Sequence, residues 1–287
     1  MSTFIDGLSL GSIYALIALG YTMVYGIAKM LNFAHGDIMM VGAYAILTTL
    51  GIYSNPFVAI AVSVVVCVLL GVFTEKLAYK PLRGASPLAV LITAIGVSYL
   101  LQSVAQLIYG AETRPVKIGS FKNVVLGSFK ISTAAIITLL AGTVLMVCLT
   151  LFIKRTKLGR AMQAVSEDRD AAQLMGINVN MIITVTFAIG SALAAFASTF
   201  YLMQIPGTSP TLGSMPGIKA FTAAVIGGIG SIPGAMVGGV LLGLIEKISL
   251  SIPALAPYTT AFEFTLLIVI LLVKPTGLLG KQIREKV

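Results

Sequence analysis

The chain has 287 residues, of which 57% are hydrophobic and only 10% are charged, and its formal net charge is +9. Soluble domains carry about 25% charged residues, so this composition excludes a soluble globular protein and predicts an all-α protein that crosses a membrane several times. No basic patch is interleaved with aromatic residues, which argues against nucleic-acid binding; basic residues in cytoplasmic loops explain the positive charge better.

Uncharged runs long enough to cross a bilayer mark the predicted spans in chain order. The first five are residues 7–28, two spans within 38–74 that separate at Ser54-Asn55-Pro56, then 87–109 and 131–153. The others are 181–203, 217–232, 234–252 and 258–273. The run at 217–232 is short for a span and is interrupted by glycines. We therefore predict one membrane domain, residues 1–287, of about eight or nine helices, some of them short or broken.

The basic residues divide unequally between alternate loops. Thirteen of the 19 lysines and arginines fall on the side that holds 154–179 and the carboxyl-terminal tail, and six fall on the other. Because basic loops stay in the cytoplasm, we expect the amino terminus outside and the carboxyl terminus inside. The segment at 110–130 is then external, and its alternating pattern predicts a small β-hairpin whose basic residues, Lys117 and Lys122 among them, help to dock a partner.

A charged helix of roughly three turns is predicted inside the cytosolic loop at 154–179. Ser166 is placed to cap its start, and Glu167 and Asp168 follow in the first turn, where negative charge suits the helix dipole. Gly176 is placed to end the helix in the left-handed conformation, and Ile177 can pack back onto the last turn.

One face of this predicted helix carries mostly small side chains at helical spacing, namely Asp168, Ala171, Ala172 and Met175. Small residues leave room for the backbone or cleft of another protein. The alternative is a solvated connector helix, and the residues alone do not favour one interpretation over the other.

Two glycine-dense segments interrupt the helical pattern. The first is NFAHGD, residues 32–37, and the second is GGIGSIPGAMVGG, residues 227–239. Broken helices are tolerated in a membrane where the backbone lines a cavity, so both segments are candidates for the translocation pathway. The candidate residues are Asn32, His35, Gly36, Asp37, Gly227, Gly228 and Gly230. Tight helix packing is the alternative, and it is favoured for the second segment.

Glu246 and Glu263 fall inside predicted spans, where carboxylates are candidates for function. Pairing with Lys219 or Lys247 is the favoured alternative. The chain has one histidine, His35, and two cysteines within apolar runs, which is too little for a metal site. No phosphate-binding loop and no hydrolase or metalloprotease motif occurs, so we expect no cofactor and no enzymatic activity of the chain's own.

Several of these segments resemble the permease subunit of branched-chain amino-acid ABC importers. They are GSIYAL at 11–16, NFAHGDIMMVGAY at 32–44, GRAMQAVSEDRDAAQLMGINV at 159–179 and AAVIGGIGSIPGAMVGG at 223–239. The resemblance extends from end to end, and the NFAHGD motif is the most specific part of it.

The resemblance implies a multi-pass subunit of a bacterial inner membrane that moves hydrophobic amino acids from periplasm to cytoplasm. It also implies four kinds of partner: a second homologous permease, two ATPase subunits, a periplasmic substrate-binding protein and the lipid bilayer. The cytosolic helix would be the ATPase-coupling helix, formed by Ser166, Glu167, Asp168, Arg169, Ala171, Ala172, Met175 and Gly176.

Two other interpretations remain open. Related permeases for urea, short amides or other amino acids look similar, so the resemblance identifies the type of transporter more firmly than its substrate. The main rival class is an ion-coupled secondary transporter that uses His35 and the intramembrane carboxylates. A membrane-embedded enzyme is the third interpretation, and the sequence offers no set of catalytic residues for it. Neighbouring ATPase genes would discriminate between these classes.

Overall fold

The computed structural model describes residues 2–119, 121, 123–126 and 129–280. Within them, eight helices are long and apolar enough to cross a membrane, counting the short turns that extend α3 and precede α11. They are α1 (Ser2–Ala28), α2 (His35–Ile52), α3 (Pro56–Thr74), α4 (Pro87–Tyr109), α5 (Thr133–Arg155), α8 (Val179–Gln204), α10 (Ile232–Ser251) and α11 (Thr259–Val273). The prediction of an all-α membrane protein is confirmed.

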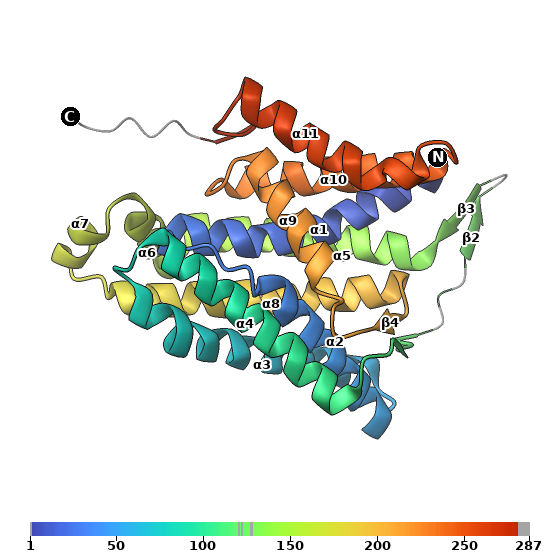
Figure 1. Ribbon diagram of the computed structural model, residues 1–287, viewed down its shortest axis with the longest axis horizontal. Coiled ribbons are helices and arrows are strands. Elements are labelled where there is room, and N and C mark those ends of the chain that lie inside the picture. Colours follow the sequence, from blue (N-terminus) through green and yellow to red (C-terminus); the bar gives the residue numbers. More distant parts are fainter. Residues whose placement is uncertain (1, 120, 122, 127–128, 281–287) are drawn as a thin grey trace.

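The helix α1 lies at the centre of the bundle (Figure 1), and its most apolar stretch is 94% buried. It packs against α5, α8, α9 and α10. The contact between α1 and α10 is close because each helix places glycine at it. A side chain on Gly11 would meet the backbone of Val240, and one on Gly243 would meet the backbone of Gly11. Small residues at such contacts let membrane helices pack through their backbones.

The predicted short span is a half-helix, α9 (Ser214–Gly227), which crosses obliquely between α2 and α10 (Figure 1). The chain reaches it from α8 through a non-helical segment. In this segment β4 (Gly207–Thr208) pairs with β1 (Arg114–Pro115), and Leu212 packs against a buried cluster formed by α2 and α4. Non-helical backbone at membrane depth requires cover by protein or a polar cavity, and here α2 covers it.

A β-hairpin is present, slightly later in the chain than the predicted segment at 110–130, and its external location stays a prediction. The strands β2 (Asn123–Leu126) and β3 (Phe129–Ser132) pair antiparallel, with Asn123 opposite Ser132. The hairpin lies at the same end of the bundle as the amino terminus (Figure 1). Lys122 and the basic tail at 281–287 lie outside the described residues.

At the opposite end of the bundle, the chain between α5 and α8 forms two short helices, α6 (Lys157–Glu167) and α7 (Arg169–Leu174) (Figure 1). The connection from α3 to α4 lies at this end as well. It continues α3 through a wide turn, Glu75–Tyr79, and a tight one, Lys80–Leu82.

Candidate functional site

The segment predicted as one helix is two helices, and the predicted cap is wrong. Ser166 is the penultimate residue of α6, and its hydroxyl donates to the carbonyl of Gln163 at 2.7 Å. Asp168 caps α7 instead, because its carboxylate accepts the N–H of Ala171 at 3.0 Å. The physical reason lies in α6, which buries Met162 and Val165 against the bundle and so continues through Ser166.

The predicted end of the helix is confirmed. Gly176 has φ of +83°, the left-handed conformation that glycine adopts without steric cost. The N–H of Gly176 donates to the carbonyl of Gln173, and the N–H of Ile177 donates to that of Ala172, each at 3.0 Å. Ile177 is partly buried and packs against the core cluster that includes Ala172, in the last turn of α7.

The predicted small-residue face is divided by the fold. Ala172 is 4% exposed and packs inside its own chain, so it is not available to a partner. Ala171 and Met175 are exposed, and so is Leu174, which the sequence reasoning missed. Leu174 and Met175 are 90% and 83% exposed, an apolar pair outside the membrane spans. The packing of Ile177 was the signal that could have identified Leu174, because it fixes which side of α7 faces the bundle and which side is exposed.

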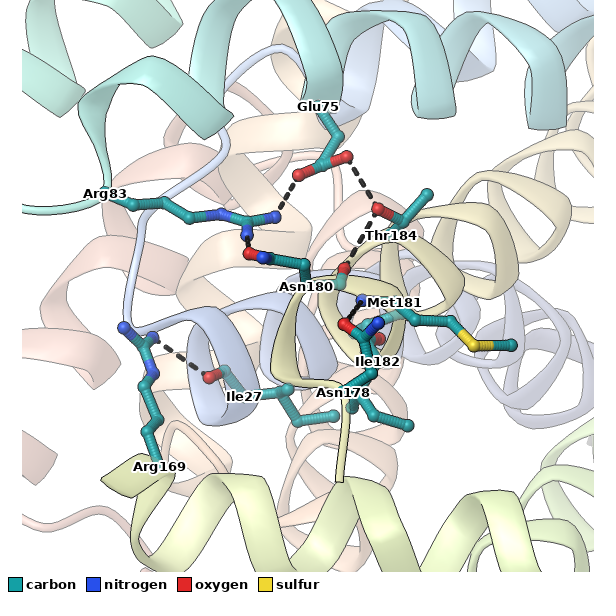
Figure 2. A network of polar contacts seen from close by, with 10 residues as sticks. Ile27, Glu75, Arg83, Arg169, Asn178, Asn180, Met181, Ile182 and Thr184 are labelled. Carbon is teal, nitrogen blue, oxygen red and sulfur yellow. Dashed lines mark hydrogen bonds and ion pairs between the residues drawn. The ribbon is translucent and has the colours of Figure 1, made fainter. Parts of the chain in front are cut away.

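Arg169 connects α7 to the central helix (Figure 2). Its guanidinium donates to the carbonyl of Ile27 at 3.0 Å, in the last turn of α1. Burial lowers the pKa of Arg169, and the neighbouring Arg83 lowers it further. A guanidinium remains charged in spite of such shifts, so the bond to Ile27 is charge-assisted.

A second set of contacts joins the ends of α3 and α8 beside Arg169 (Figure 2). Arg83 forms an ion pair with the buried carboxylate of Glu75 and donates to the side chain of Asn180. The other oxygen of Glu75 accepts from the hydroxyl of Thr184 at 2.9 Å. The ends of α1, α3 and α8 thus meet in one polar layer against α7.

The NFAHGD segment forms the predicted interruption between α1 and α2. The chain leaves the helix at Lys29, which has φ of +51°, and resumes it at His35. Asn32 accepts from the hydroxyl of Tyr79 at 2.7 Å. The His35 ring is buried edge-on against Tyr21, with 5.1 Å between ring centroids, and its Nε2 has no hydrogen-bond partner among the described residues. The interruption is therefore filled by aromatic and polar side chains.

Asp37 is buried and is paired by α4. Its carboxylate accepts from the hydroxyl of Ser98 and from the amide of Gln102, the latter at 3.0 Å. The same amide lies 3.2 Å from the hydroxyl of Ser214, at the start of α9. One polar cluster thus joins α2, α4 and α9 within the membrane domain.

The two glycine segments meet different parts of α9. A side chain on Gly36 would collide with the backbone of Gly213 at the start of α9. Gly227 lies at the other end of α9, against the carbonyl of Gly234, and Gly230 lies near Gly26 of α1. The second segment, residues 227–239, therefore packs closely through its backbone, which is the tight helix packing that the sequence favoured for it.

The favoured pairing of the intramembrane glutamates is also present. Lys219 of α9 lies 2.9 Å from Glu246 of α10 and 3.1 Å from Glu263 of α11. Glu246 also accepts from the hydroxyl of Tyr14 on α1 at 2.7 Å. Lys219 rather than Lys247 is the partner of both carboxylates.

Among the described residues, no three histidine, cysteine or carboxylate side chains gather as a metal site would require. The polar clusters described above connect helices of the bundle to one another.

Comparison with known proteins agrees with this architecture. The chain is 44% identical to BraD of Pseudomonas aeruginosa, a high-affinity branched-chain amino acid transport system permease protein, over all of this chain and 98% of that protein. It is 44% identical to LivH of Escherichia coli K12, which carries the same description, over 98% of this chain and 96% of that one.

In fold, the chain is similar to a metal-chelate type ABC transporter solved in an inward-facing conformation. The TM-score is 0.52 with 15% sequence identity, over 93% of this chain and 85% of that one. Residues 3–271 match the family described as the permease component of the branched-chain amino acid transport system. The chain therefore belongs to this family of ABC importer permeases.

Proposed function

We propose that this chain carries branched-chain amino acids across the bacterial inner membrane into the cytoplasm, driven by two ATPase subunits. A second homologous permease and a periplasmic binding protein complete the proposed complex. The descriptions of the relatives support the substrate class and the transport system, and the named partners are what the resemblance to ABC importer permeases implies. The feature of this chain that supports ATPase coupling is α7, which presents Leu174 and Met175 while Arg169 bonds to the central helix.

The polar layer of Figure 2 supports a specific route for the coupling. An ATPase that moves α7 pulls on Arg169, and Arg169 holds the last turn of α1 through Ile27. The interruption at 29–34 follows directly, and it separates α1 from α2. We propose that ATPase closure is transmitted through Arg169 to this interruption, which opens the inner end of the route.

The translocation route is proposed to pass where α1, α2 and α9 converge. Support comes from Asn32, His35 and Asp37, which place polar groups at membrane depth beside non-helical backbone. Gly36 is proposed to act through packing, since it seats the start of α9 on α2. The second segment, Gly227, Gly228 and Gly230, is proposed to act as the hinge between α9 and α10.

The decisive experiment is reconstitution of the permease pair with its ATPase and binding subunits in proteoliposomes. We expect ATP-dependent uptake of L-leucine that persists when ionophores collapse the ion gradients. Uptake that follows the gradient and ignores ATP would establish the ion-coupled class instead. A panel with urea, acetamide and polar amino acids identifies the substrate, and preference for urea or acetamide would refute the proposed one.

Orientation has its own test. A cysteine in place of Gln173, in a background lacking Cys67 and Cys148, should react with a membrane-impermeant maleimide only in inside-out vesicles. Labelling of intact cells would place α7 outside and overturn both the topology and the coupling proposal.

A further inference from the structure

A polar cavity of about 340 Å³ lies at the end of the bundle proposed to face the periplasm. Its walls come from the start of α1, the start of α5, the end of α8 and the end of α10. Small-molecule sites have volumes of about 300–1,000 Å³, so this cavity suits a small solute and not a peptide. It is separate from the coupling helix at the other end of the bundle.

Two opposite charges that line this cavity have no side-chain partner among the residues that the structure describes. Asp6 of α1 and Lys247 of α10 both line it. No ion pair within 4.0 Å and no side-chain hydrogen bond joins either of them to any described residue. The other charged group, Glu246, is already held by Lys219 and Tyr14. A bound molecule carrying both an ammonium and a carboxylate would pair the two free charges.

The rest of the wall is suited to an aliphatic side chain. Leu10, Ile13, Met203 and Leu250 line the same cavity, and Tyr201 adds a hydroxyl at its edge. Apolar side chains beside a few charged groups that fix orientation are the usual composition of a small-molecule site.

The cavity lies on the same face of α1 as the proposed route. Its inner wall is Tyr14, and Tyr21 follows seven residues later, on the same face of α1 about two turns further in. Tyr21 contacts the His35 ring. Tyr14 and Tyr21 thus connect the cavity with the interruption through one face of α1.

A larger cavity among the described residues does not compete for this role. It measures about 590 Å³ between α2, α3 and α4, and its lining is mostly apolar, with hydroxyl groups from tyrosines and threonines but no charged side chain. A zwitterion there would lose water without gaining ionic partners, which is costly.

We propose that the cavity between Asp6 and Lys247 is an entry site for a zwitterionic aliphatic amino acid. Asp6 binds the ammonium and Lys247 binds the carboxylate. The site rests on the proposed function, since it names where the delivered substrate first binds. Its binding is weak, because a tight site would delay passage inward.

The test uses the permease in nanodiscs of phosphatidylglycerol, so that no zwitterionic headgroup competes. Saturation-transfer NMR measures binding of L-leucine, of isopentylamine, which lacks the carboxylate, and of 4-methylpentanoate, which lacks the ammonium. On the unaltered protein, leucine should bind more tightly than either analogue. An analogue that binds as well as leucine would refute the two-charge site without any mutation.

The variants assign the two charges. Lys247→Gln should weaken leucine and 4-methylpentanoate by about tenfold or more and leave isopentylamine unchanged, because one charge-assisted contact is lost. Asp6→Asn should weaken leucine and isopentylamine instead. Lys80→Gln, an exposed lysine in the connection from α3 to α4 and outside the cavity, is the matched control and should change nothing. Wild-type binding of all three ligands by both cavity variants would overturn the proposal, as would displacement of leucine by added phosphatidylethanolamine.

Parallel uptake measurements separate this inference from the proposed function. If the complete transporter moves leucine but leucine gives no saturation transfer at the cavity, the entry site alone is wrong. If the cavity binds leucine with the expected selectivity but the complete transporter does not move it, the proposed function is wrong.

Discussion

Replacing Leu174 by alanine tests whether the exposed end of α7 docks on an ATPase. Leu174 is 90% exposed in the isolated chain, so the permease itself loses almost no buried apolar surface. The free energy of unfolding of the permease should change by no more than about 0.5 kcal/mol. Any larger effect must arise in the complex.

The expected loss in the complex follows from the area that docking would cover. Complete burial of a leucine side chain contributes about 1.5–3 kcal/mol. Since about 1.4 kcal/mol is a tenfold change in affinity, the dissociation constant for the ATPase subunits should rise about ten- to hundredfold.

The assay is titration of purified ATPase subunits onto permease in nanodiscs, together with ATP-dependent uptake in proteoliposomes. The control is Gln173→Ala, which truncates the adjacent exposed side chain but removes little apolar surface. It should bind the ATPase within about twofold of wild type, as expected of a surface substitution. Equal affinities for the two variants would show that the end of α7 is not covered by the ATPase.

Ala172, chosen from sequence as the docking position, is unsuitable for this test. It is 4% exposed, so Ala172→Glu would bury an unpaired charge inside the permease. We expect that variant to lower the melting temperature of the isolated permease, which would conceal any effect on docking. An unchanged melting temperature would contradict the buried position of Ala172.

Two further predictions concern the central helix. Gly20→Ala should destabilise the protein by about 1–3 kcal/mol, because the new methyl group would collide with the His35 ring. The control, Gly96→Ala, has open space around the new methyl group and should be neutral or stabilising by up to about 1 kcal/mol. Thermal unfolding of the two variants measures the difference. Arg169→Leu should lower the ratio of uptake to ATP hydrolysis, because the hydrogen bond to Ile27 is lost. Arg169→Lys should restore part of this ratio. A wild-type ratio in Arg169→Leu would show that the hydrogen bond does not transmit the movement of α7 to α1.

Much of the architecture could be predicted because it depends on local properties. A run such as 7–28 must be helical in a bilayer, since a spanning segment has to satisfy its own backbone hydrogen bonds. In the structure this helix is α1, Ser2–Ala28, which begins a few residues before the predicted run and ends at the same residue. Gly176 and the alternating pattern of the hairpin are equally local, since each depends on the conformational preference of a few neighbouring residues.

The packing of α7 could not be read in the same way. Ser166 and Asp168 are both good caps by residue type. Burial of Met162 and Val165 on the bundle decided between them, because it carries α6 past Ser166. Ala172 likewise looked available on a helical wheel, and the fold alone turned it inward.

The polar clusters depended on tertiary structure most of all. Sequence showed that Glu246 and Glu263 needed partners, because a buried carboxylate is costly alone. That Lys219 serves both follows only from the crossing of α9, which places its ammonium between α10 and α11. Asp6 and Lys247 are separated by most of the chain, and only the packing of α1 against α10 brings them to one cavity.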